Sequence, residues 1–150
     1  MPSSYVCLHY HIVFSTKGRY PWLKPEMRER LFQYMGGIIR GLGGTLLAAG
    51  GIADHIHLLA SLSKTHGLSN DIRDIKAESS AWIHKTFPEL KGFAWQVGYG
   101  AFTVSYSALP RVRAYVKNQE QHHRKQSFQE EFRELLQRHE IEFDERYIWN

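Results

Sequence analysis

The pattern of apolar and polar positions predicts four strands and four helices. Alternation of the two kinds of residue indicates a strand, and apolar residues at intervals of three and four indicate a helix. Alternation predicts strands over residues 5–15, 45–51, 54–61 and 93–106. Gly98 and Gly100 interrupt the last of these and indicate a bulge. Helical spacing predicts helices over residues 25–40, 68–87, 110–125 and 128–139.

The order of these elements predicts an α+β fold. A βαββαβ order is typical of the ferredoxin-like fold, in which an antiparallel sheet carries two helices on one face and the first strand lies beside the third. The additional C-terminal helices must then pack on the other face or on a second subunit. No repeat, low-complexity segment or linker divides the chain, so we expect one domain over residues 1–150.

Composition adds few constraints. The chain is 43% hydrophobic and 23% charged, as in ordinary globular proteins, and contains no run of 18 apolar residues. We therefore expect no membrane span, no secretory signal and a cytoplasmic location, which the single Cys7 also suits. A net charge of +4 and a pI of about 9.2 weakly favour a polyanionic partner.

The segment 54–59, Asp-His-Ile-His-Leu-Leu, contains the most informative motif. Side chains two residues apart in a strand point to the same face, so His55 and His57 project together while Ile56 and Leu58 enter the apolar layer. Two neutral imidazoles side by side form half of a metal site. The alternative is a pair of half-exposed histidines on a polar sheet face.

A second His-x-His motif lies on the first predicted strand. Because the first and third strands are neighbours, His9 and His11 could approach His55 and His57. We expect them to have supporting or structural roles. The pattern of three alternating histidines is not met, since Leu59 stands at the third place.

The predicted helix over 110–125 carries a tyrosine and a glutamine one turn apart. Tyr115 and Gln119 would lie on one face, and the Gln119 carbonyl oxygen could bind a hard cation. The helix is strongly basic, as a phosphate-binding surface would be. The alternatives are a core tyrosine and a solvated basic face.

Taken together, these motifs resemble the single-tyrosine HUH transposases of the insertion sequence 200/605 group. The resemblance covers nearly the whole chain. It includes His11–Phe14, Thr16–Arg19, Asp54–Leu59, Lys76–Ser80, Trp95–Phe102, Tyr115–Gln119 and the His122-His123 pair. Gly18 departs from the pattern, where a larger residue is expected in the basic turn.

The resemblance implies a metal-dependent DNA transposase, an enzyme that cleaves and rejoins single-stranded DNA at insertion-sequence ends. It assigns His55, His57 and Gln119 to a divalent metal, Mg²⁺ or Mn²⁺, and makes Tyr115 the nucleophile that forms a 5′-phosphotyrosine and releases a 3′-OH. It also implies a homodimer with composite active sites, in which the tyrosine helix of one subunit completes the histidine site of the other, and recognition of hairpin ends as single strands.

The basic side chains give candidate DNA contacts. The candidates for phosphate binding are Lys17, Arg19, Arg73, Lys76, Arg111 and Lys117. Tyr99, Phe102 and Trp95 could stack on unpaired bases, although they could equally belong to the core or to a dimer interface.

Three other classes of protein agree less well with the sequence than the transposase does. A replication or conjugation HUH nickase is usually a larger protein with helicase or other domains, and the short chain argues against this class. A domesticated, non-catalytic hairpin-binding relative would not need Tyr115 together with the predicted ligands. A structural zinc domain usually needs several cysteines, and the chain has one.

Overall fold

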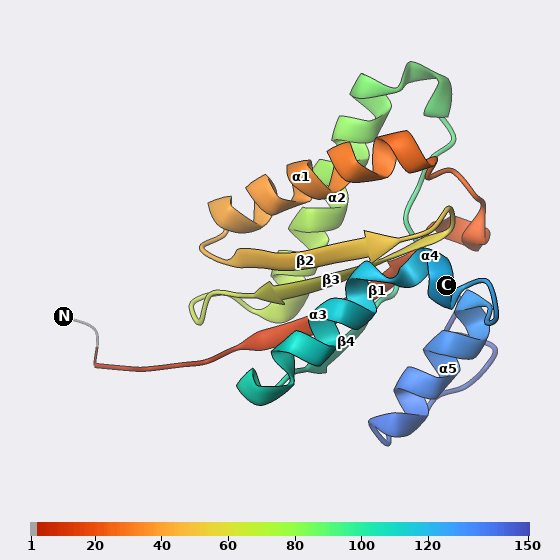
Figure 1. The fold of residues 1–150 in the computed structure, drawn as a ribbon. Helices are drawn as coiled ribbons and strands as arrows, with labels where there is room; N and C mark the ends of the chain where they lie inside the picture. Colours follow the sequence, from red (N-terminus) through yellow and green to blue (C-terminus); the bar gives the residue numbers. More distant parts are fainter. Residues whose placement is uncertain (1–2) are drawn as a thin grey trace.

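The computed structural model describes residues 3–150 and contains one four-stranded antiparallel sheet (Figure 1). The strands are β1 (His9–Ser15), β2 (Thr45–Gly51), β3 (His55–Ser61) and β4 (Gly100–Thr103), in the spatial order β2-β3-β1-β4. The α-helices are α1 (Pro25–Gly41), α2 (Leu68–Thr86), α3 (Leu109–Lys117), α4 (Gln119–His122) and α5 (Phe128–Arg138). Short 3-10 turns are η1 (Lys17–Arg19), η2 (Pro88–Leu90) and η3 (Tyr106–Ala108). The ferredoxin-like α+β prediction is confirmed, including the pairing of the first strand with the third.

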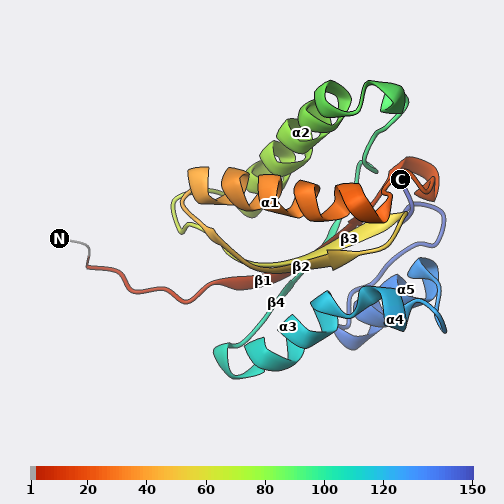
Figure 2. The same ribbon diagram turned by 45° about the horizontal axis from the view of Figure 1, so that its top comes forward.

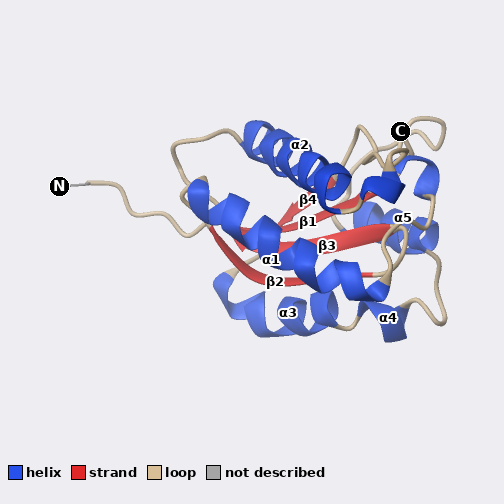
Figure 3. Cartoon of the chain, turned by 90° about the horizontal axis from the view of Figure 1, so that it is seen from above, coloured by secondary structure: helices blue, strands red, loops and turns tan. Residues whose placement is uncertain are grey.

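The sheet is covered on both faces. Helices α1 and α2 lie on one face, and α3, α4 and α5 lie on the other, so the C-terminal helices pack on their own chain (Figures 2 and 3). Ile56 and Leu58 are fully buried in the core under α1 and α2, as predicted. Val13 and Phe102 pack with α5 on the opposite face.

The first and last strands are shorter than predicted. β1 begins at His9, because the preceding residues leave the sheet and the side chains of Tyr5 and Val6 are exposed. Residues 93–99 form only one isolated bridge, between Thr16 and Trp95, and β4 begins at Gly100. The predicted bulge at Gly98 and Gly100 is therefore wrong.

A side chain interrupts the ladder at this point. The Gln96 side-chain oxygen accepts a hydrogen bond from the Ser15 backbone N–H at 2.8 Å, and the Gly98 N–H donates to the Asn150 carbonyl at 2.8 Å. The Lys76 ammonium binds the carbonyls of residues 96, 97 and 98 at 2.9, 3.1 and 2.6 Å. These contacts satisfy backbone groups that a continuous strand would have paired.

The predicted single helix over 110–125 is in fact two helices. Asn118, at φ −100° and ψ 30°, leaves helical geometry between α3 and α4. Its N–H still bonds the Ala114 and Tyr115 carbonyls, at 3.1 and 3.3 Å. Gln119, which follows the break, is buried, whereas Lys117 and Asn118 are exposed.

Two glycines allow the helices of the second layer to approach the strands. A Cβ at Gly50 of β2 would lie 1.8 Å from the Val116 carbonyl oxygen of α3. A Cβ at Gly100 of β4 would lie 2.6 Å from Cε1 of Phe132 on α5. Neither position leaves room for a Cβ beside its neighbour, so these two residues help to set where α3 and α5 lie over the histidine face of the sheet.

No helix between residues 3 and 150 combines the length and apolar character needed to cross a membrane.

Candidate active site

The two histidines of β3 point into the space between the sheet and helices α3–α5. Both His55 and His57 are fully buried. The His55 Nδ1–H donates to the Asp54 carboxylate at 2.8 Å, and the His57 Nδ1 lies 2.7 Å from the His11 Nε2. The strand geometry therefore brings the pair together as predicted, and His11 supports it from β1.

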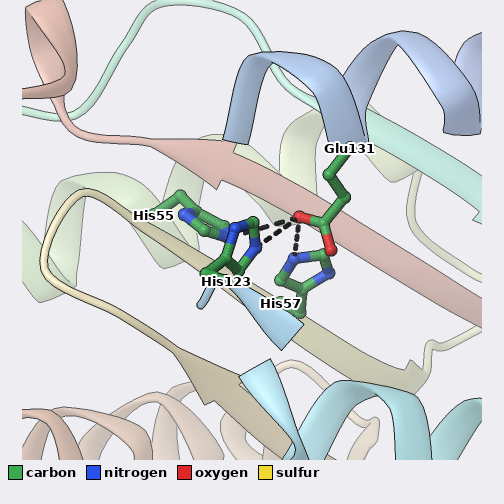
Figure 4. A group of neighbouring side chains, drawn as sticks. All are labelled: His55, His57, His123 and Glu131. Carbon is green, nitrogen blue, oxygen red and sulfur yellow. Dashed lines mark hydrogen bonds and ion pairs between the residues drawn. The ribbon is translucent and has the colours of Figure 1, made fainter. Parts of the chain in front are cut away.

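A third histidine and a carboxylate face this pair (Figure 4). Oε1 of Glu131 lies 2.9 Å from the His57 Nε2, 3.0 Å from the His123 Nε2 and 3.3 Å from the His55 Nε2. Potential ligand atoms of these four residues lie within 4.8 Å of one another, so the group could hold a metal ion. The His55 Nε2 is buried without a hydrogen-bond partner, as expected of an atom that awaits a ligand.

Glu131 was not singled out from the sequence, although the sequence contains a signal for it. In α5, the apolar residues Phe128, Phe132 and Leu135 recur at helical spacing and are buried. Glu131 falls on the same stripe and is 1% exposed. A lone carboxylate on an apolar helix face is unusual unless it meets a partner.

Local capping fixes where α5 begins. The Ser127 side chain accepts a hydrogen bond from the Glu130 backbone N–H at 3.2 Å, and the Glu130 side chain accepts from the Ser127 N–H at 3.4 Å. This capping box sets the first turn, in which Glu131 lies.

The tyrosine of α3 reaches the same cluster. The Tyr115 hydroxyl donates a hydrogen bond to Oε2 of Glu131, whose other oxygen contacts the histidines. His122 approaches the same Oε2, with its Nε2 at 3.2 Å. Tyr115 is half-buried, so the phenol is neither sealed in the core nor fully exposed.

Gln119 lies at the edge of the cluster. Its side-chain oxygen is 3.0 Å from the His123 Nε2, and its amide nitrogen donates to the Tyr115 carbonyl at 3.0 Å. Gln119 is 1% exposed. The three predicted ligands and the predicted nucleophile therefore lie in one place, together with His123 and Glu131.

The electrostatics of the cluster follow from burial and from this one carboxylate. Burial would raise the pKa of Glu131, but the three imidazoles around its carboxylate hold it well below its usual range. Burial lowers the pKa of His57 to about 4. Burial also opposes protonation of His55, yet the neighbouring Asp54 and Glu131 carboxylates outweigh it and raise its pKa. Burial and the neighbouring Glu131 raise the pKa of Tyr115, so the phenol keeps its proton here.

The predicted DNA contacts are divided between exposed and engaged side chains. Lys17, Arg111 and Lys117 are exposed. Arg73 is also exposed and lies 3.4 Å from Asp74. All four remain predictions as phosphate contacts.

The other two basic candidates are half-buried. The Arg19 guanidinium lies over the Trp149 ring, 5.5 Å from its centroid. The Lys76 ammonium holds the loop at residues 96–98 through three carbonyls. Trp95 is buried and donates to the Ser79 hydroxyl at 3.0 Å, so it belongs to the core and not to a base-stacking surface.

Two hollows adjoin the site. A pocket of about 460 Å³ opens beside Tyr115, and its lining includes Phe102, Arg111, Arg138 and His139. A groove of about 950 Å³ follows β2 between α1 and α3–α4. Its charged lining residues are Arg28, Arg40, Lys117, Arg124, Glu29 and Glu120, and Arg28 pairs with Glu120 at 2.9 Å. The first of these hollows places Arg111 and Arg138 near the candidate nucleophile.

Comparison with known proteins identifies relatives over most of the chain. The ISDra2 transposase TnpA of Deinococcus radiodurans is 25% identical over 117 residues, which cover 75% of this chain and 84% of that protein. The transposase for insertion sequence element IS200 of Salmonella typhimurium is 28% identical over 115 residues, covering 73% and 75%.

Solved structures agree with these relatives. A Deinococcus radiodurans protein assigned as a transposase superposes with a TM-score of 0.64 at 26% identity, covering 79% of this chain and 96% of that one. A REP-associated tyrosine transposase bound to a REP hairpin has a TM-score of 0.55 at 16% identity, covering 77% and 70%, and so supports the fold alone.

The family model for IS200-like transposases matches residues 4–119, from before β1 to Gln119. This range includes the histidine strand and Tyr115, whereas His123 and Glu131 lie beyond it. The match spans well over half of the chain, and the protein therefore belongs to the IS200-like transposase family.

Proposed function

We propose that this transposase cleaves and rejoins single-stranded DNA at insertion-sequence ends through a covalent bond between Tyr115 and a 5′-phosphate. One observation carries the proposal: the Tyr115 hydroxyl shares the Glu131 carboxylate with His55 and His57. A nucleophile and a set of metal-binding side chains are the two parts that phosphodiester cleavage requires.

The chemistry is a balanced transesterification. The Tyr115 oxygen forms a bond to the scissile phosphorus while the bond from phosphorus to the 3′ oxygen breaks. The phenol loses its proton, and the departing 3′ oxygen gains one and becomes a hydroxyl. The phosphotyrosine keeps the energy of the phosphodiester, so a second 3′-OH can reverse the attack and join new ends without ATP.

The side chains around Tyr115 fit these demands. A divalent cation held by His55, His57 and Gln119, either Mg²⁺ or Mn²⁺, would supply positive charge that offsets the anionic phosphate. Glu131 keeps the phenol protonated and oriented toward the cluster before substrate binds. His122 lies 3.5 Å from the same hydroxyl and offers a second polar contact.

Single-stranded hairpin ends are the proposed substrate, and the basic hollows support this. Arg111 and Arg138 line the pocket beside Tyr115, and Lys117 lines the groove along β2. We propose that Arg111 and Lys117 bind phosphates on either side of the scissile bond, with Lys17, Arg19, Arg73 and Lys76 further along the strand. A structural neighbour at 16% identity was solved with a hairpin bound.

The subunit arrangement is a separate proposal. The resemblance implies a homodimer in which each tyrosine completes the partner's histidine site. Here Tyr115 meets His57 of its own chain through Glu131. We therefore propose that one chain can assemble a working site in cis, and the homodimer remains a prediction.

Covalent capture tests the proposed function. Full-length protein is incubated with Mn²⁺ and labelled single-stranded oligonucleotides that cover the flanks of the reading frame, including any subterminal hairpin. We expect a denaturant-stable adduct that is absent in Tyr115→Phe and present in a control, Tyr147→Phe, in which an exposed tyrosine away from the site is changed. A parent that binds these hairpins but gives no adduct would instead indicate a non-catalytic binding relative.

A further inference from the structure

We propose that Glu131 and His123 are direct ligands of the divalent cation, so that three imidazoles and one carboxylate of a single chain hold it together with the Gln119 oxygen. Both residues lie outside the range 4–119 that matches the family model. The inference rests on the proposed function only in taking this cation to be the one used for DNA cleavage. It adds two ligands from the C-terminal segment to His55 and His57.

The hydrogen-bond partners of the histidines determine which nitrogens are free. The His55 Nδ1 faces the Asp54 carboxylate at 2.8 Å, and the His123 Nδ1 faces the Gln126 carbonyl at 2.6 Å. Both partners can only accept, so each Nδ1 carries the hydrogen. In the neutral rings, the Nε2 atoms of His55 and His123 therefore carry no hydrogen, and each presents a lone pair.

These lone pairs face oxygens that are themselves acceptors. Oε1 of Glu131 lies 3.3 Å from the His55 Nε2 and 3.0 Å from the His123 Nε2. The Gln119 oxygen also lies 3.0 Å from the His123 Nε2. Lone pairs that converge in a buried space repel unless positive charge lies among them. One divalent cation would satisfy all of these atoms at once.

The surroundings are those of metal-ligating histidines. Such histidines usually donate their second ring N–H to a carboxylate or to a backbone carbonyl, which fixes the ring and increases its basicity. Asp54 does this for His55, and the Gln126 carbonyl does it for His123. His57 has the corresponding contact through His11. This outer set of contacts is more than a structural histidine cluster requires.

Glu131 provides the anionic member of the set. Its side chain is 1% exposed, and its carboxylate contacts imidazoles and the Tyr115 hydroxyl. Oε1 faces the histidines while Oε2 faces Tyr115, so the carboxylate would link the cation to the nucleophile. A set that includes three nitrogens suits Mn²⁺ and other transition metals better than Mg²⁺, which prefers oxygen ligands.

Metal titration without DNA tests the ligand set. Chelator-treated full-length protein is titrated with Mn²⁺, and the EPR signal of free aqueous Mn²⁺ gives the affinity. We expect Glu131→Gln to weaken Mn²⁺ binding by at least roughly tenfold to a hundredfold, the range that loss of an outer contact already produces. The control is Glu134→Gln, an exposed position on the same helix, with affinity unchanged.

A spectroscopic measurement covers the case in which Glu131→Gln does not fold. Glu131→Asp keeps the charge but shortens the side chain, and we expect it to alter the visible absorption of bound Co²⁺. His123→Gln should change the same bands. Parental Mn²⁺ affinity in Glu131→Gln, a parental Co²⁺ spectrum in Glu131→Asp, or no metal binding by the parent would each overturn the proposal.

Failure of this proposal can be told apart from failure of the proposed function. Tyr115→Phe should bind Mn²⁺ with parental affinity and form no adduct. A parent that forms the adduct while Glu131→Gln binds Mn²⁺ normally would leave the transposase intact and remove Glu131 from the ligand set.

Discussion

The contact between β2 and α3 gives a sharp test of how the tyrosine is positioned. Gly50 lies under the α3 backbone, and an added Cβ would lie 1.8 Å from the Val116 carbonyl oxygen and 2.9 Å from the carbonyl carbon. Both atoms belong to the backbone, so no side-chain rotation can relieve the clash. Real Cβ atoms essentially never lie closer than 3.0 Å to such an atom. The α3 helix must therefore move away from the sheet by about 1.2 Å.

This displacement acts directly on Tyr115, which precedes Val116 in the helix. The phenol would move by a similar distance relative to His55 and His57, because β3 stays in place. A misplacement of about 1 Å in an active site can lower the rate by about a hundredfold. Overpacking of this kind also costs about 1–3 kcal/mol of stability. We therefore expect Gly50→Ala to fold and to form the Tyr115–DNA adduct about a hundredfold more slowly than the parent.

Two measurements separate positioning from folding. Single-turnover adduct formation gives the rate, and urea unfolding gives the free energy of unfolding. Gly37→Ala serves as the control, because its Cβ meets nothing within 4 Å and alanine favours the α1 helix by up to about 1 kcal/mol. A Gly50→Ala protein that forms the adduct at the parental rate would show that α3 does not position Tyr115 as described.

Two further predictions concern the C-terminal helices. Ser127→Ala removes the capping box of α5 and should lower the free energy of unfolding by about 1 kcal/mol, measured by urea unfolding, with a weaker Mn²⁺ affinity because Glu131 lies in the first turn. Mixing His57→Ala chains with Tyr115→Phe chains should restore no adduct, because each site takes both residues from one chain. Recovered adduct in the mixture would establish exchange of the tyrosine helix between subunits.

The parts of the site that follow from local periodicity were predictable from the sequence. The alternation over 54–61 placed His55 and His57 on one face and Ile56 and Leu58 in the core, and the structure agrees. The antiparallel neighbour relation of β1 and β3 brought His11 to His57. These relations depend only on the two-residue repeat of a strand and on the order of the elements.

The parts that depend on tertiary contacts were not predictable. Lys117-Asn118 is only a weak signal for a helix end, and the continuous helix predicted over 110–125 is wrong. Strand pairing over 93–99 also failed, because the Gln96 side chain and the Lys76 ammonium take the backbone partners. Such long-range competition for hydrogen bonds leaves no periodic trace in the sequence.

The segment from α3 to α5 behaves as one structural unit, and this bears on the question of exchange between subunits. The His123 ring binds the Gln126 carbonyl and the Gln119 oxygen, which ties α4 to the turn before α5. Tyr115 and Glu131 are joined directly across this turn. A dimer that exchanged the tyrosine helix would therefore have to carry His123 and Glu131 with it, or else break these bonds. If these bonds are kept, the nucleophile and the proposed C-terminal ligands have the same origin, and the part of the site that a partner would supply is the histidine strand.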